Sequence, residues 1–247
     1  IGSHATVEDL ADVLAKILKI DDENYLKNWE KQDRLTKKRM KYLNDLQIKT
    51  LHFKSSVTDF KVSFRKEAKY EGCSEKLPNG KTFFPNLPTE EIFTVPDRMT
   101  AEGYITTTRP VKVLGKDTEE VTLFFKEGKC YDVKAKKGLQ AMKSLLSSDE
   151  GSSYLGEVAL VDNNAPISKS GLVFGSILID ENASCHLALG AGYPSCLDIK
   201  DENPKDYGCN ESIVHVDFMV GSSDMEITAE TYRKKIVKIM IDGKFQF

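Results

Sequence analysis

The segment Val214–Val220 places an imidazole and a carboxylate two residues apart within an otherwise apolar run. If this run forms a strand, its side chains alternate between two faces, so that His215, Asp217 and Met219 share one face. That polar face has two interpretations: half of a metal site, or a neutral core histidine hydrogen-bonded to a nearby aspartate. For an isolated pair the second arrangement is the more common. Other parts of the chain have to discriminate between them.

Length and composition describe an ordinary globular chain. The 247 residues are enough for one large domain, or for one domain with an added helical segment. The net charge of −3 leaves no basic excess, so nucleic acid is not expected as a partner. No apolar run approaches the roughly 20 residues that span a bilayer, so a membrane protein is not expected either.

The cysteines and the first residues predict the compartment. The five cysteines form no C-x-x-C pair, and their odd number argues against a complete disulfide framework. A reducing, cytoplasmic location is therefore expected. Residues 1–4 lack the features of a signal peptide and resemble a remnant of an expression vector, so His4 is not considered as a ligand.

Residues 1–49 are predicted to form a helical segment. Thr6 is a plausible N-cap, with Asp9 three positions later and apolar residues following at helical spacing. A second helix is expected from about Glu23 to Leu46. Its inward side would carry Trp29, Met40, Leu43 and Leu46. The basic run at residues 37–39 is expected to lie on its solvated face.

Residues 50–247 are predicted to form a mainly β domain that carries the chemistry, which makes the fold class α+β with N-terminal helices. Short β-like runs alternate with turn residues. The expected strands are Val57–Phe64, Gly103–Val113, the hairpin Val121–Phe125 and Lys129–Val133, a buried strand Gly171–Ile179, and a final hairpin around Asp242-Gly243. A short helix is expected at Gly138–Leu146.

Few residues are able to join the pair at 215 and 217 in a metal site. Besides His4 the chain has only His52, His186 and His215, and His52 is expected to be structural. His186 is compatible with the start of a helix, on which Tyr193, two turns later, would point the same way, although Gly190 and Gly192 disfavour a helix. Glu157 is a lone carboxylate in an apolar run that predicts a strand, where burial without a partner would be costly.

The acidic pair Glu90-Glu91 lies in a turn that leads into a strand. Alternation would direct the two carboxylates to opposite faces, so only one is expected to enter a shared site. On residue type, one set suits two divalent cations held by oxygen and nitrogen ligands without thiolate: Glu91, Glu157, Glu181, His186, His215 and Asp217. Taken singly, each member is also explained as a capped turn, a core pair or a surface acid.

Four longer strings make the metal interpretation more specific. They are Asn86–Phe93, Leu155–Val161, Asp180–Gly190 and His215–Ser222. In order and spacing they resemble the motifs of the metallo-aminopeptidase family typified by aminopeptidase T and aminopeptidase S, and Pro166–Gly171 matches as well. The resemblance covers the chain after about residue 7. It implies a cytosolic, homodimeric exopeptidase that removes N-terminal residues from peptides with two divalent ions, such as zinc, cobalt or magnesium.

The resemblance also implies roles for individual residues. It implies metal ligands at Glu91, Glu157, His186, His215 and Asp217, with Glu181 as a further ligand or a nearby acid. Tyr193 is expected to donate a hydrogen bond to the oxyanion at the catalytic site. Glu90 and Glu181 are both candidates for the general base, and the sequence does not rank them.

Family members are substantially longer, and this chain is expected to lack most of an N-terminal α/β domain. One alternative is therefore a non-catalytic metal-binding or dimerisation fragment without its substrate-covering domain. A two-metal phosphoesterase would need basic residues or a glycine-rich anion loop beside the ligands, and apart from Lys169 little of this kind is present. A Cys185–His186 nucleophile is disfavoured because neighbours on a helix point about 100° apart.

Overall fold

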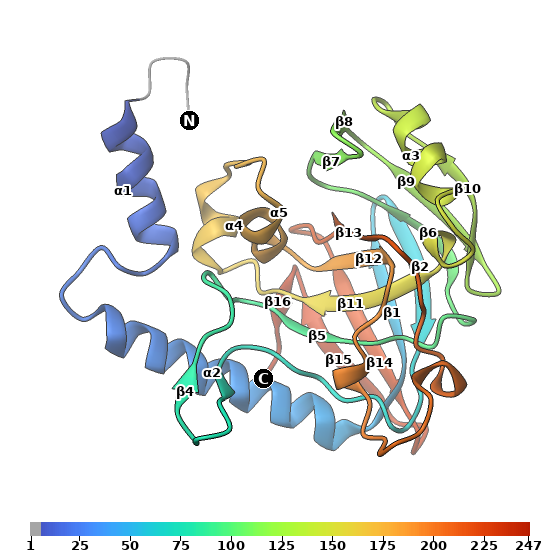
Figure 1. Ribbon diagram of the computed structural model, residues 1–247, viewed down its shortest axis with the longest axis horizontal. Coiled ribbons are helices and arrows are strands. Elements are labelled where there is room, and N and C mark those ends of the chain that lie inside the picture. The colour runs from blue at the N-terminus through green and yellow to red at the C-terminus, as the bar shows by residue number, and fades with distance from the viewer. Residues whose placement is uncertain (1–5) are drawn as a thin grey trace.

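The computed structural model describes residues 6–247 as a few helices and two main antiparallel sheets, with two further small strand pairs (Figure 1). The helices are α1 (Val7–Ile17), α2 (Tyr25–Leu46), α3 (Leu139–Leu146), α4 (Pro166–Ser170) and α5 (Ile177–Asp180), and short 3₁₀ turns occupy Gly151–Ser153, Glu181–Ala183, Pro194–Cys196 and Pro204–Tyr207. Within residues 6–247, no helix has the length and apolar composition to cross a bilayer.

The N-terminal helices form as the sequence predicts. Thr6 caps α1 by accepting the Asp9 N–H at 3.1 Å, and the Asp9 carboxylate accepts the Thr6 N–H at 2.8 Å, which completes a capping box. On α2, Trp29 and Leu43 are buried. Figure 1 shows α2 running along one edge of the body. A loop joins α1 to the start of α2, and α1 lies beside α4. A domain boundary near residues 49 and 50 stays a prediction.

The prediction that residues 37–39 lie on a solvated face is wrong at Arg39. Its guanidinium Nη2 lies 2.7 Å from Asp162 Oδ2, and both side chains are largely buried. Lys38 is exposed, as expected. The reason is that the face of α2 that carries Arg39 packs against the body instead of facing water.

The larger sheet has eight strands in the order β10-β9-β6-β2-β1-β14-β15-β16. Its strands are β1 (Ile48–Ser55), β2 (Thr58–Ser63), β6 (Glu102–Thr106), β9 (Thr122–Lys126), β10 (Lys129–Lys134), β14 (Glu226–Thr231), β15 (Ile236–Ile241) and β16 (Lys244–Phe245). Aromatic rings in tilted and edge-to-face contact fill its inner face, with the Phe60 centroid 6.1 Å from Phe53 and 5.3 Å from Phe125. The two predicted hairpins, β9–β10 and β15–β16, are confirmed.

The smaller sheet has four strands in the order β13-β12-β11-β5. They are β5 (Ile92–Thr94), β11 (Leu155–Leu160), β12 (His186–Gly190) and β13 (His215–Met219), and all pairs are antiparallel. Apolar residues such as Val158, Leu187 and Phe218 belong to the same buried cluster as the large-sheet aromatics. Since alternate residues point the other way, the opposite face of the small sheet is free to carry polar groups.

Two remaining pairs are short: β3 (Glu75–Lys76) with β4 (Thr82–Phe83), and β7 (Val111–Val113) with β8 (Lys116–Thr118). The second pair corrects the single strand expected at Gly103–Val113. The chain turns at residues 107–110, so β6 joins the large sheet and β7 pairs separately.

The buried strand expected at Gly171–Ile179 is also wrong, because these residues form an open loop that ends in α5. Val173 is 46% exposed. The Asp180 carboxylate accepts the N–H groups of Phe174 and Ser176 at 2.8 and 3.2 Å and so holds the loop. Side chain to backbone hydrogen bonds of this kind compete with strand pairing, and they decide the local structure here.

The helix expected to begin at His186 is strand β12 instead. Its backbone pairs with β11 on one side and β13 on the other, which satisfies both rows of polar groups. At the end of β12, Gly190 has a φ of 109°, and a Cβ there would lie 2.0 Å from the Val214 carbonyl oxygen. Only glycine allows this close approach between strands.

Candidate metal centre

The polar face of the small sheet brings together side chains from neighbouring strands. In the strand register, Glu157 of β11 lies opposite Ala188 of β12, and Ala188 lies opposite Asp217 of β13. His215 lies opposite Gly190. Because β12 contributes only alanine and glycine at these two positions, the longer side chains on either side have room to meet above it.

Both imidazoles are oriented by the backbone. His186 Nδ1 lies 3.2 Å from the Ser184 carbonyl oxygen, and His215 Nδ1 lies 2.7 Å from the Ala191 carbonyl oxygen. A carbonyl only accepts, so each Nδ1 carries the hydrogen and donates it. Each Nε2 is then turned toward the carboxylates. This is the arrangement by which a second contact orients a metal-binding histidine.

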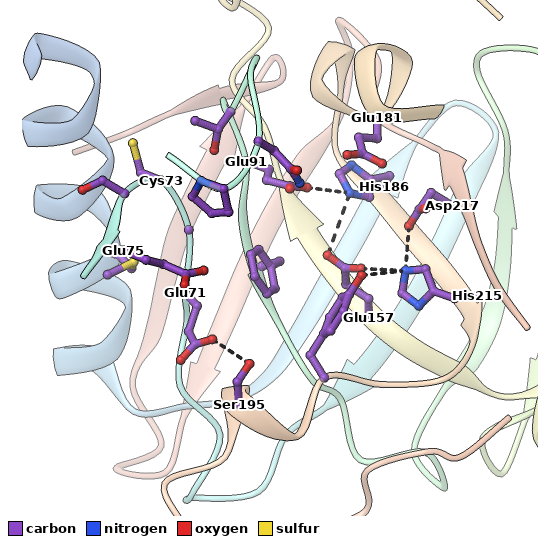
Figure 2. A pocket seen from close by; sticks show the side chains of 18 of the residues that line it. Glu71, Cys73, Glu75, Glu91, Glu157, Glu181, His186, Ser195, His215 and Asp217 are labelled. Carbon is purple, nitrogen blue, oxygen red and sulfur yellow. Dashed lines mark hydrogen bonds and ion pairs between the residues drawn. The ribbon is translucent and has the colours of Figure 1, made fainter. Parts of the chain in front are cut away.

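Five side chains form two overlapping groups of three (Figure 2). In the first, His186 Nε2 lies 3.0 Å from Glu91 Oε2 and 4.0 Å from Glu157 Oε1. In the second, His215 Nε2 lies 3.2 Å from Glu157 Oε2 and 3.3 Å from Asp217 Oδ1. The ligand atoms of each group lie within 4.8 Å of one another. The Glu157 carboxylate belongs to both groups, one oxygen facing each.

The carboxylates control the charge state of these histidines. Burial lowers the pKa of His186, but hydrogen bonding to Glu91 and the surrounding negative charge outweigh it and raise the value to about 10. Burial likewise opposes a rise for His215, whose contacts with Asp217 and Glu157 raise its pKa to about 11. Burial raises the pKa of Glu157. Asp217 is equally buried, yet the hydrogen bond from His215 holds its pKa below the usual range.

Glu181 lies beside this cluster. It stands in the 3₁₀ turn that follows α5, and Figure 2 shows its carboxylate next to His186. Among the described residues, none forms a hydrogen bond or ion pair with its side chain. Burial, followed by the charges of Glu91 and Asp217, raises the pKa of Glu181 to about 8. It is therefore a carboxylate available to exchange a proton.

Tyr193 stands at the rim of the site. Its hydroxyl lies 3.4 Å from His215 Nε2, and its ring packs against Phe93 with centroids 5.5 Å apart. Burial and the nearby carboxylates raise its pKa, so the hydroxyl keeps its proton at neutral pH and is able to donate it in a hydrogen bond. The expected proximity to the site is found, although it arises from a loop after β12 and not from a helix.

A cavity of about 540 Å³ extends from the cluster. This is within the range of small-molecule sites, about 300–1,000 Å³. Its far wall is the segment 71–76, which includes Glu71 and Glu75 (Figure 2). Sequence reasoning missed this wall because it carries no motif. A two-way backbone bridge between Glu71 and Phe93 of β5 holds the start of this segment at the site.

The structure does not bring Glu90 to the cluster. Its carboxylate pairs with Lys19 and accepts a hydrogen bond from Gln32 Nε2 at 2.8 Å. Adjacent residues in extended backbone point to opposite sides, so Glu91 entering the site directs Glu90 away from it. This corrects the expectation of Glu90 as a general base.

The other two residues considered from the sequence are also placed outside the site. His52 contacts Asp59 on the large sheet. Cys185 is buried, and its sulfur accepts the Val161 N–H at 3.4 Å. Burial raises the pKa of this thiol to about 12, which opposes formation of a thiolate nucleophile.

The donor set fits divalent cations. It consists of carboxylate oxygens and imidazole nitrogens, which suit zinc and related divalent ions and do not need thiolate. Within residues 6–247, no lysine or arginine forms an ion pair with Glu91, Glu157, Glu181 or Asp217. Without metal, the protonated imidazoles of His186 and His215 are the counter-charges of this buried cluster. With both imidazoles neutral and all four carboxylates ionised, the four negative charges would match the four positive charges of two divalent ions.

Comparisons with known proteins identify the family of this chain. The profile of the thermophilic metalloprotease family (M29) matches residues 2–245. Aminopeptidase AmpS from Bacillus subtilis is 36% identical over 243 residues, which cover 96% of this chain and 59% of AmpS. Aminopeptidase PepS from Streptococcus thermophilus is 38% identical and covers 96% of this chain and 58% of PepS.

A solved structure is similar as well. Wild-type AmpT from Thermus thermophilus is 37% identical and superposes with a TM-score of 0.86, over 90% of this chain and 55% of the AmpT chain. The likeness confirms the α+β fold and the resemblance carried by the four motifs. This chain spans less than two thirds of the length of each of these relatives.

Proposed function

Since the chain belongs to the thermophilic metalloprotease family M29, we propose that it carries the metal centre of an aminopeptidase, which hydrolyses the N-terminal peptide bond of peptides with two divalent ions. The relatives that support this are named aminopeptidases. One observation carries the proposal: Glu157 is shared by two groups of potential ligands, one oxygen facing each.

The proposed ligands divide between the two groups. Glu91 and His186 would hold one ion and His215 and Asp217 the other, with Glu157 available to both. When bound, such a pair of ions supplies an acidified water nucleophile and polarises the scissile carbonyl. The residues of the chain orient the imidazoles and move the proton.

Glu181 is proposed as the general base. Its carboxylate lines the same cavity, and its neighbours raise its affinity for a proton, as a base that works near neutral pH requires. It would take the proton of the attacking water and pass it to the nitrogen of the scissile bond, which leaves as the new amino terminus of the shortened peptide. Glu90 is not suited to this role because Lys19 and Gln32 already hold its carboxylate.

Tyr193 is proposed to stabilise the oxyanion. Its hydroxyl faces the cluster and keeps its proton, so it is able to donate a hydrogen bond to the oxygen of the attacked carbonyl as negative charge develops there. Removal of one such donor costs about 10²–10³-fold in kcat in other enzymes. Phe93 holds the phenol ring in place.

The finer expectations remain part of the proposal. The ions are zinc, cobalt or magnesium, the substrates are peptides with a free N-terminus, and the protein acts as a homodimer in the cytoplasm. The homodimer is tested by sedimentation, which reports the mass in solution.

The central experiment is metal-dependent release of N-terminal residues. The metal-free chain is incubated with short peptides, then again after addition of zinc, cobalt or magnesium, and free amino acids are measured. Hydrolysis is expected only with metal and should be lost in His215→Ala. Activity that needs no metal, or that survives this substitution, would reject the mechanism. Metal uptake without hydrolysis would favour the alternative, a metal-binding fragment that needs the remainder of its relatives' length for catalysis.

A further inference from the structure

Glu90 is a buried carboxylate that the mechanism does not use, although it adjoins the proposed ligand Glu91. Its side chain is only 7% exposed. Two N-terminal helices supply its partners: Lys19, which follows α1, forms an ion pair with it, and Gln32 of α2 donates a hydrogen bond at 2.8 Å. Lys19 precedes Glu90 by 71 positions in the chain, and Gln32 precedes it by 58.

The backbone of Glu90 is tied to the other side of the site. Its N–H donates to Asn182 Oδ1 at 2.6 Å in a buried hydrogen bond. Asn182 in turn donates through Nδ2 to the Leu178 carbonyl at 3.1 Å. Asn182 adjoins Glu181. The hydrogen bond between Glu90 and Asn182 therefore joins the segments that carry the Glu91 and Glu181 carboxylates.

The backbone conformation of Lys19 indicates that its side chain is needed for the contact with Glu90. Lys19 is the residue after the α1 C-cap and has a φ of 56°, in a turn that Ile20 closes by donating to the Ala15 carbonyl at 2.9 Å. Glycine usually occupies this left-handed position, because a Cβ is unfavourable there. Here a lysine occupies it, and its ammonium passes over the Trp29 ring at 4.9 Å on its way to Glu90.

We propose that Lys19 and Gln32 are positioning residues of the metal centre. By holding the Glu90 side chain, they fix the spacing between Glu91 and Glu181, which both line the cavity. This inference rests on the proposed metal site. It gives the N-terminal helices a function at that site, which is to place one ligand of one ion.

The proposal predicts an asymmetric effect. Glu91 belongs only to the group that contains His186, whereas the group of His215 and Asp217 does not include it. Loss of the Lys19 and Gln32 contacts with Glu90 should therefore lower the affinity of one ion site and leave that of the other unchanged. A general loss of stability would weaken both sites together.

Cobalt binding to the whole chain tests this, because the visible absorption of cobalt reports each site without hydrolysis. Metal-free wild type, Lys19→Met and Gln32→Leu are titrated with cobalt. In Lys19→Met, the dissociation constant of one site should rise about tenfold, within the range for loss of groups that orient metal ligands, and the second should not change. Gln32→Leu should cause a smaller rise at the same site. Lys19→Arg, which keeps the charge, should restore binding in part.

Lys41→Met is the matched control. Lys41 lies on α2 and pairs with Asp45 at 2.7 Å, with 75% of the lysine side chain exposed. This variant should bind cobalt as the wild type does. Unchanged affinity and spectrum in a folded Lys19→Met chain would overturn the positioning role. Wild type that binds no cobalt would overturn both this role and the proposed metal site. The failure of the positioning role alone is therefore distinguishable from the failure of the metal site.

A second variant covers the case in which Lys19→Met does not fold. Removal of only one partner leaves a buried charge, whereas Lys19→Met with Glu90→Met removes both charges. The double variant should fold and should show the same weakened site. A folded double variant with two wild-type cobalt sites would overturn the proposal. Gln32→Leu removes no charge and gives an independent result in either case.

Discussion

Each of the two sheets carries a histidine paired with an aspartate, but the two pairs have different surroundings. On the large sheet, His52 Nε2 lies 2.7 Å from Asp59 Oδ1. On the small sheet, His215 Nε2 lies 3.3 Å from Asp217 Oδ1. The shorter contact belongs to the pair outside the candidate metal centre. Distance within a pair therefore does not identify a metal site.

The two pairs differ in the exposure of the aspartate and in the third charged group that lies beside them. The Asp59 side chain is 47% exposed and lies 4.0 Å from the Lys54 ammonium, so solvent and a cation share its charge. The Asp217 side chain is 8% exposed, and the third partner of His215 is another carboxylate, Glu157. A histidine and an aspartate become candidate ligands where further anions accumulate in a buried place without a lysine or arginine.

The largest expected effect is a loss of stability in a variant of the large sheet that leaves metal binding on the small sheet unchanged. Phe60→Ala removes a fully buried ring and should lower the free energy of unfolding by about 3–5 kcal/mol. Cobalt affinity of the folded protein should not change. Urea unfolding and cobalt titration measure the two quantities. An equal loss of cobalt affinity in folded protein would show that the two sheets do not act separately.

The next effect concerns the small-sheet histidine. His215→Ala removes a proposed ligand and should reduce metal affinity and hydrolysis by more than about 100-fold, the upper range for loss of groups that only orient ligands. Metal content after dialysis and release of N-terminal residues measure it. Retention of both ions at full affinity would contradict the assignment.

Metal should also stabilise the whole fold. At a free metal concentration of about 100 times the dissociation constant, binding adds about 2.7 kcal/mol. For a chain of this size that corresponds to a rise in Tm of about 5–10 °C. Thermal unfolding with metal and with excess chelator tests this. Identical Tm values in a sample that has taken up metal would show binding outside the folded site.

Metal affinity should increase with pH. Without metal, the pKa values of His186 and His215 are raised to about 10 and 11, so both imidazoles carry a proton at neutral pH. A metal ion binds only the neutral imidazole and must displace that proton. Below these pKa values, affinity should rise about tenfold per pH unit for each proton displaced. Calorimetry in buffers with different ionisation enthalpies counts the protons, and a count of zero would contradict the assignment of both histidines.

The smallest effect is expected for the other histidine. His52→Ala changes a partly exposed side chain on the large sheet and should alter stability by less than about 0.5 kcal/mol. Cobalt affinity and hydrolysis should equal those of wild type. A tenfold loss of cobalt affinity in this variant would remove the distinction between the two histidine pairs.

Local patterns predicted much of the fold. The Thr6–Asp9 capping box marks the start of α1, and the Glu127-Gly128 turn marks the β9–β10 hairpin. Each depends on residues within a few positions of one another. The predictions fail at Gly171–Ile179 and at His186, where an apolar run without alternation does not distinguish a buried strand from a loop or helix.

The sequence by itself determined the residue types of the candidate ligands, the shared face of His215 and Asp217, and the family, because these depend on residue type and on spacing along one strand or motif. Tertiary structure decided that Glu157 joins two groups of candidate ligands, that Lys19 and Gln32 hold Glu90 outside the site, and that the Arg39 side chain is largely covered. The physical reason is that spacing along a strand sets the face on which a side chain lies. The register and packing of distant segments set which of those side chains meet.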